Sequence, residues 1–208
     1  MSISALLMSA GLAAATLDPK STEIFREKLF RRVTYGLDNA ALLYRIEVSP
    51  EGRMLSCAAE DKFGDKLLLA RFCRFAKTLR YVPGSAPDGT KVHGVIRGYV
   101  GNRLFSLVRS KEPPHMVPQP DVELSVSTPL PESNATLDLG AAVYVDASGK
   151  GVACKVGKGR NPFGDAACEY ALKKEWPIFR DERGLAVPFT AVTHVRFIGP
   201  APEIDGQR

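Results

Sequence analysis

The chain has 208 residues, of which 45% are hydrophobic and 25% are charged, and its formal net charge is +5. This length can hold two small domains with modest cores, and the composition is that of a globular protein. The positive charge is compatible with acidic or anionic partners. Nucleic acid is not an expected partner, because no stripe of interleaved aromatic and basic residues is present.

The N-terminal segment has the features of a signal peptide. Its first fifteen residues carry no charge and end in three alanines, Ala13 to Ala15. The apolar run is too short to span a bilayer, which needs about 20 residues. We therefore expect residues 1–15 to be a signal peptide that is cleaved before Thr16, and the mature protein to act in a bacterial periplasm without membrane insertion. The alternatives are an N-terminal segment that is buried or frayed in the folded protein, and a start site assigned too late.

Residues 16–100 form the first predicted unit. Two strands are joined by the turn at residues 49–52, where Pro50 and Gly52 interrupt the alternation of apolar residues. A helix follows, for which Asp65 is a plausible N-cap. Its apolar residues recur at helical spacing, namely Leu69, Phe72, Cys73, Ala76 and Leu79. A last strand that includes residues 95–99 closes the unit.

Residues 101–121 form a connector that contains four prolines, at positions 113, 114, 118 and 120. Such a segment is expected to be extended and semi-rigid. Apolar and polar residues then alternate from Val122 to Val126, as in a strand. This stretch is expected at the edge of the second unit rather than in a free linker.

Residues 122–208 form the second predicted unit, in which the same elements follow in the same order. Two strands flank a turn at residues 146–149, and the second of them contains Cys154. Asp165 is a plausible cap of the following helix, which Pro177 would end. In the last strand Phe189, Ala191, Thr193, Val195 and Phe197 share one face, while Thr190, Val192, His194 and Arg196 share the other.

The two units are related by an internal repeat, which decides the expected architecture. A shift of 97 residues places Gly52 on Gly149 and Cys57 on Cys154. A shift of 95 then holds to the end of the unit, where it relates Cys73 to Cys168, Tyr81 to Trp176, and Gly89 to Gly184. The sequence therefore predicts two copies of one α+β unit.

The repeated unit resembles the TonB C-terminal domain family (TonB/TolA C-terminal domains). The residues that carry the resemblance are YVDASGKGVACKV (Tyr144–Val156), Cys168, and the run from Trp176 through Gly184 to Phe197, with the same frame from Tyr44 to Val100. The resemblance implies two small β-β-α-β units, each an antiparallel sheet packed by a helix. The membrane helix and the Pro/Lys-rich spacer of an energy transducer are not expected here, and this chain carries two units.

The four cysteines occupy matched places in the two units. We therefore expect disulfides between Cys57 and Cys73 and between Cys154 and Cys168, which would fit an oxidising compartment. A disulfide that closes a loop of ~15 residues is worth about 3 kcal/mol in the chain-entropy model. The alternatives are four buried free thiols and, with less support from the spacing, a zinc site.

No catalytic motif is recognisable in the sequence. The three histidines, His93, His115 and His194, do not lie at metal-ligand spacing, and no nucleophile elbow, HExxH motif or Walker loop is present. We therefore expect no enzyme activity, no cofactor and no bound metal. A basic glycine-rich loop is the one weak candidate for an anion site, through Lys155, Lys158 and Arg160.

The resemblance implies a role in protein binding. In this family the final strand can accept an extended partner peptide as an added strand, because unpaired backbone groups at a sheet edge give affinity. The matching edge consists of Val192, Thr193, His194, Val195 and Arg196, and the matching stretch of the first unit is residues 95–99. The partner could be an outer-membrane receptor linked to TonB-type transport. The alternatives are an anionic envelope ligand at the basic loop and a small hydrolase that uses His194.

Overall fold

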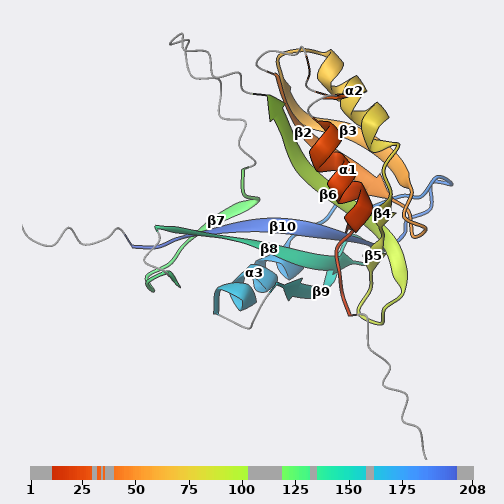
Figure 1. Ribbon diagram of the computed structural model, residues 1–208. Helices are drawn as coiled ribbons and strands as arrows, with labels where there is room; N and C mark the ends of the chain where they lie inside the picture. Colours follow the sequence, from red (N-terminus) through yellow and green to blue (C-terminus); the bar gives the residue numbers. More distant parts are fainter. Residues whose placement is uncertain are drawn as a thin grey trace, which may run out of the picture.

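The computed structural model describes residues 11–29, 32–33, 35, 40–102, 119–131, 135–157 and 162–200. This part of the chain is an α+β protein with one large mixed sheet and three helices. The strand order in the sheet is β3 (Met54–Phe63), β2 (Ala40–Val48), β6 (Lys91–Asn102), β10 (Phe189–Ile198), β8 (Thr136–Val145) and β9 (Gly151–Val156). The first three strands come from the first half of the chain and the last three from the second half (Figure 1).

The first half contains the strand–strand–helix–strand order that the sequence predicts. Its main elements are β2 (Ala40–Val48), β3 (Met54–Phe63), α2 (Leu67–Ala76) and β6 (Lys91–Asn102). Two short strands, β4 (Tyr81–Val82) and β5 (Gly84–Ser85), lie between the helix and the last strand. β2 pairs antiparallel with both β3 and β6.

The second half repeats this order with β8 (Thr136–Val145), β9 (Gly151–Val156), α3 (Pro162–Lys173) and β10 (Phe189–Ile198). β8 pairs antiparallel with both β9 and β10. The alternating stretch after the connector is β7 (Val122–Ser125), which pairs parallel with the end of β10. It therefore belongs to the sheet, as its alternation predicts.

Each half contains one side-chain hydrogen bond that has a counterpart 95 residues away in the other half. The Tyr81 hydroxyl donates to the carbonyl of Ala76 at 2.8 Å, and the Trp176 indole N–H donates to the carbonyl of Ala171 at 3.0 Å. Both pairs are related by 95 residues. In each half an aromatic side chain thus satisfies a carbonyl in the last turn of the helix, where no intrahelical donor is left.

The turn glycines repeat as well. Gly52 and Gly149 have φ values of 75° and 87°, which favour glycine, and lie at the tips of the two hairpins. Their carbonyls accept hydrogen bonds from the amides of Tyr81 at 3.3 Å and Trp176 at 3.2 Å, respectively. Each hairpin tip is therefore tied to the segment that follows the helix.

The halves join edge to edge in one sheet, rather than forming the two separate antiparallel sheets expected from the sequence. β6 and β10 pair parallel through Phe189 with His93 and Thr190 with Gly94. The strand order is palindromic about this parallel pair, so the relation between the halves is a two-fold rotation about an axis along the strands. Such a rotation puts the helices on opposite faces, and in Figure 1 α2 lies on one side of the sheet and α3 on the other.

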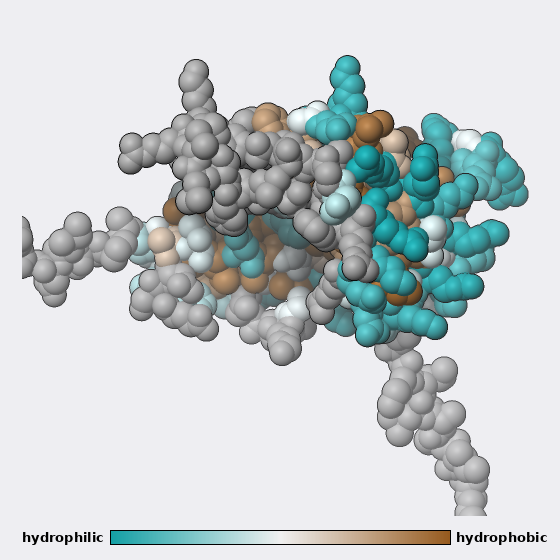
Figure 2. Space-filling model, turned by 45° about the horizontal axis from the view of Figure 1, so that its top comes forward, coloured by the Kyte–Doolittle hydropathy of each residue, from teal (hydrophilic) through white to brown (hydrophobic). Residues whose placement is uncertain are grey.

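Two hydrophobic cores follow from this arrangement. The first lies between α2 and its sheet, where Leu42, Leu68 and Phe72 are at most 2% exposed. The second lies between α3 and β8–β10, and includes Phe189 and Phe197. Val95 of β6 packs into the second core, so the first half contributes a side chain to the second. In Figure 2 the hydrophilic residues gather toward the right of the visible face, with apolar residues to their left.

The helix starts differ in detail from the sequence prediction. The N-cap of α2 is Lys66 rather than Asp65, and the Asp65 carboxylate instead accepts a hydrogen bond from the amide of Leu67 at 2.7 Å. Asp165 is not a cap, because α3 already begins at Pro162. Proline suits the first helical position, where an amide hydrogen would have no partner.

The segment before the first sheet is part of the fold. β1 (Thr16–Leu17) pairs antiparallel with β4, and the helix α1 (Pro19–Leu29) follows it. The sequence analysis missed this helix, although the Asp18 carboxylate caps it through the amide and hydroxyl of Ser21 at 3.0 and 2.8 Å. An aspartate followed by a proline is the start signal that could have revealed it.

Both expected disulfides are present. Cys57 of β3 is bonded to Cys73 of α2, and Cys154 of β9 is bonded to Cys168 of α3. In each half the disulfide fastens the helix to the outermost strand of the shared sheet. Among the described residues, no helix is both long and apolar enough to cross a membrane.

Candidate functional site: the fork between β6 and β10

The predicted docking edge, Val192 to Arg196, lies inside the sheet. β8 pairs with β10 along its whole length, and β7 pairs with its other side from Val195 onward. Just before the stretch that pairs with β7, His194 is hydrogen-bonded to Asp121. The His194 amide donates to the Asp121 carboxylate at 2.8 Å, and the His194 carbonyl accepts from the Asp121 amide at 2.7 Å. The structure thus differs from the expectation, because the segment leading into β7 folds back onto β10.

The open strand is β6 instead. Its pairing with β10 stops at Gly94, and from Val95 onward its strand partner among the described residues is β2 alone. Figure 1 shows β6 and β10 running apart from this point. We call the space between β6 after Gly94 and β10 after Thr190 the fork. It contains the weaker of the two edges expected from the sequence, residues 95–99.

Charged side chains bridge the fork. The Arg97 guanidinium of β6 contacts the Glu60 carboxylate of β3 at 2.7 Å and the Asp121 carboxylate at 2.7 Å. Lys174, which follows α3, lies 3.5 Å from Asp121 and 4.6 Å from the centre of the Trp176 ring. Asp121 is the centre of this cluster, since both halves of the chain place a cation on its carboxylate.

The electrostatics of the cluster favour its charged state. Burial raises the pKa of Asp121, but the hydrogen bond from the His194 amide and the charges of Arg97 and Lys174 outweigh it, so the pKa lies below its usual value. Burial lowers the pKa of Arg97, while hydrogen bonds to Glu60 and Asp121 raise it more. Each ion of the pair therefore stabilises the charge of the other.

Two cavities open along the fork, on either side of Arg97. One of about 130 Å³ has apolar walls that include Val95, Trp176 and Phe189, and Arg45 and Lys174 also line it. The Nε atom of Arg45 is buried without a hydrogen-bond partner. Leaving a buried donor unpaired is costly, so the site offers a hydrogen bond that the described residues do not use.

The second cavity, of about 170 Å³, is lined by Leu43, Glu60, Arg97, Gly98, Gln119 and His194. It extends from Leu43 of β2 to His194 of β10. Leu43 and Arg45 of β2 share one face of the sheet with Val95 and Arg97 of β6, so both cavities lie on that face, along β6. They can take alternate side chains of an extended ligand, which point to the same side.

The described histidines lie in different surroundings. His194 is exposed, as its position on the outer face of β10 predicts. His93 is half-buried, with its ring 5.3 Å from that of Phe179, and burial lowers its pKa. Phe179 therefore covers one side of the His93 ring. His115 lies outside the described residues.

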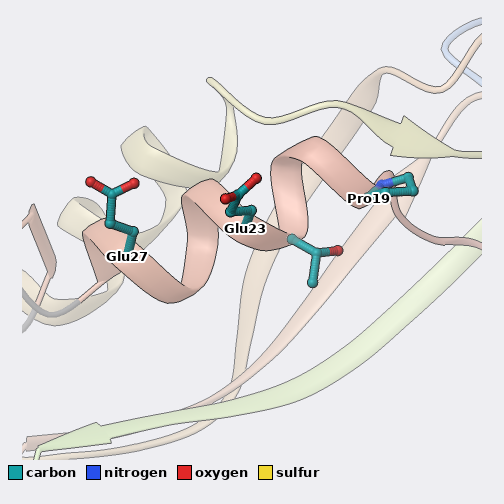
Figure 3. Close-up of a pocket in the computed structure, with 4 residues that line it drawn as sticks. Pro19, Glu23 and Glu27 are labelled. Atoms are coloured by element: carbon teal, nitrogen blue, oxygen red, sulfur yellow. The ribbon is translucent and has the colours of Figure 1, made fainter.

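The basic loop is only partly described. Lys155 lies on β9, whereas Lys158 and Arg160 fall outside the described residues. A separate hollow runs along α1, where Pro19, Glu23 and Glu27 lie on one side of the helix (Figure 3). Its two carboxylates point outward, and the Thr22 hydroxyl that also lines it donates to the Asp18 carbonyl at 3.0 Å, so the hollow is not a candidate for chemistry.

Within the described ranges, no three His, Cys, Asp or Glu side chains are placed to hold a metal ion. Comparison of the chain with protein-family models, with curated proteins and with solved structures finds no match. The fork is therefore characterised by its own geometry.

No sequence pattern predicts Asp121 and Lys174 as members of a site. Asp121 ends the proline-rich connector, and a single carboxylate after a run of prolines gives no sign of its partners. One signal was available for Trp176, since its match to Tyr81 in the repeat marks it as a structural anchor.

Proposed function

We propose that the protein is a non-catalytic binding protein that docks an extended partner peptide in the fork. The peptide would pair with the open side of β6 as an added strand. The single observation that carries the proposal is that β6 loses its β10 partner after Gly94 while cavities line the strand beyond. Unpaired strand backbone gives affinity for a peptide, and side pockets give selectivity.

The lining of the fork suggests which peptides would bind. Trp176, Phe189 and Val192 offer an apolar wall for one side chain. The unpaired Nε of Arg45 offers a hydrogen bond to a carboxylate, and charge-assisted hydrogen bonds are among the strongest available. We therefore expect a peptide that presents an apolar residue and an acidic residue two positions apart, because alternate residues of a strand share one face.

The disulfides suggest the setting. Two bonds of this kind are compatible with an exported protein, since cytosolic thiols are kept reduced. In a periplasmic setting the resemblance to TonB C-terminal domains suggests a segment of an outer-membrane receptor as the partner.

The first experiment is a selection of random 12-residue peptides displayed on phage against the full, oxidised chain. The selected peptides should contain an apolar and an acidic residue separated by one position. Hydrogen exchange with a synthetic copy of one of them should show new protection at residues 95–100. Failure to select any peptide, or protection confined to β9, would contradict the proposal.

Two adjacent proline variants, Val95→Pro and Ile96→Pro, locate the docking side. Successive amides of a strand point to opposite sides, so one substitution removes a donor to β2 and the other removes a donor in the fork. The variant that keeps its β2 pairing should stay folded and lose at least tenfold in affinity. Undiminished binding by that folded variant would rule out strand addition at β6.

A further inference from the structure

A second site at which an extended segment is added to a strand lies near the start of the described residues. The segment of residues 12–17 lies antiparallel to residues 81–85. The Ala13 amide donates to the Ser85 carbonyl at 3.1 Å, and the Ser85 amide donates to the Ala13 carbonyl at 2.8 Å. The end of the expected signal peptide is therefore an added strand in this structure.

Two side chains of this segment are buried. Leu12 is 7% exposed and Ala15 is 5% exposed, whereas Ala13 between them is exposed. Ala15 is part of the first hydrophobic core. The segment is thus held as a bound peptide would be, by backbone pairing and by two buried side chains three positions apart.

A missing side chain creates the space for Ala15. A Cβ atom built on Gly94 would overlap the Cβ atom of Ala15. The same added atom would lie 3.4 Å from the amide nitrogen of Gly84. Gly94 therefore forms the floor of the place that Ala15 fills. Only a small residue fits above this floor, so the place selects by size.

We propose that the groove formed by residues 81–85 and Gly94 is a peptide-binding site that the chain itself fills with Leu12 to Ala15. Cleavage after Ala15, at the site that the three alanines predict, would remove this occupant and leave Thr16 as the N-terminus. The vacated groove then takes an extended segment of a partner with a large apolar residue followed three positions later by alanine or glycine. This site is separate from the fork and does not depend on it.

The tether explains why the groove is filled in this structure. A segment joined through a few residues competes at an effective concentration near the millimolar range. A free peptide with the same contacts cannot displace it at ordinary concentrations. A test must therefore first weaken the chain's own segment while leaving the rest of the protein unchanged.

The test uses the full chain and a fluorescent synthetic peptide with the sequence of residues 8–17. Wild type should not bind it, because its own segment fills the groove. Ala15→Arg places a long charged side chain where only a methyl group fits, so this variant should bind the peptide at least tenfold more tightly than wild type. Ala13→Arg is the matched control, since position 13 is exposed, and it should behave as wild type does.

A second experiment moves the methyl group from the peptide to the floor of the groove. Gly94→Ala in the full chain should expel the chain's own Ala15, and it should bind a peptide carrying glycine at that position at least tenfold more tightly than the alanine peptide. This comparison holds even if Ala15→Arg does not fold. Equal binding of the two peptides, or no binding of either, would overturn the proposal. A dimer formed by exchange of the segments between chains would assign the groove to a second copy and also overturn it.

Discussion

The guanidinium of Arg97 and the carboxylate of Asp121 form an ion pair of 2.7 Å that joins the two halves of the chain across the fork. The Asp121 side chain is only 11% exposed and also accepts hydrogen bonds from Thr193 and His194. We predict that Asp121→Asn lowers the free energy of unfolding by about 2 kcal/mol, because hydrogen bonds to a charged group are worth roughly 1.5–3 kcal/mol. Urea denaturation of both proteins measures this difference.

The matched control is Glu51→Gln. Glu51 pairs with Arg53 at 3.7 Å, but both side chains are more than half exposed. Exposed pairs of this kind contribute little, so the control should unfold at the same urea concentration as wild type. Equal stability of Asp121→Asn and the control would mean that the bridge across the fork does not hold the halves together.

The same pair predicts a dependence of stability on pH. The pKa of Asp121 is lowered in the folded chain, below the unfolded value of about 3.9. Its contribution is therefore fully present above about pH 4 and is lost as the pH falls through the folded pKa. The difference in unfolding free energy between wild type and Asp121→Asn should stay constant from pH 7 to pH 5 and shrink below pH 4. A difference that does not shrink would assign the effect to packing rather than to charge.

Local patterns in the sequence predict most of the elements of this fold. The alternation of β10 is seen from Ala191 to Phe197, where Ala191, Thr193, Val195 and Phe197 are buried and the residues between them are less so, whereas Phe189 and Thr190 are both buried. Period-two alternation reports which residues share a face, and that property is local. The cysteines likewise lie at matched positions in the repeat, and both disulfides are present.

The junction between the halves could not be predicted in the same way. It rests on two parallel residue pairs, Phe189 with His93 and Thr190 with Gly94, whose members are 96 residues apart. No periodicity of either strand specifies this partner. The location of an open edge could not be predicted for the same reason, because an edge is defined by the absence of a neighbour and β10 obtains β6 and β7 as neighbours from distant segments.

The two turn glycines occupy matched places in the repeat, so their substitution should change the free energy of unfolding by similar amounts. Gly149 has a φ of 87°, and a Cβ atom there would lie 2.6 Å from the carbonyl oxygen of Trp176. At Gly52, with a φ of 75°, a Cβ atom would overlap the carbonyl oxygen of Tyr81. We predict that Gly52→Ala and Gly149→Ala each lower the free energy of unfolding by about 2–3 kcal/mol, since backbone strain and a steric clash add.

Gly184→Ala separates these two effects. Gly184 has a φ of 79°, similar to the other two, but no atom lies within 4 Å of a Cβ built there. Only the backbone strain remains, and thermal or urea unfolding should show a loss of about 1 kcal/mol. A loss at Gly184 as large as at Gly149 would show that the contact with Trp176 contributes nothing.

The disulfides provide the last prediction. Cys154 of β9 and Cys168 of α3 lie 14 residues apart in sequence, and their bond fastens the outermost strand to the helix. The chain-entropy model gives about 3 kcal/mol for a loop near this length, so Cys154→Ala/Cys168→Ala should lose roughly that much stability against urea. The corresponding variant of Cys57 and Cys73, whose separation is 16, should lose a similar amount, because the loop is nearly the same. Non-reducing peptide mass mapping of wild type must show both bonds. A stability loss confined to one half would mean that the two bonds, although matched in position, do not constrain equivalent parts of the unfolded chain.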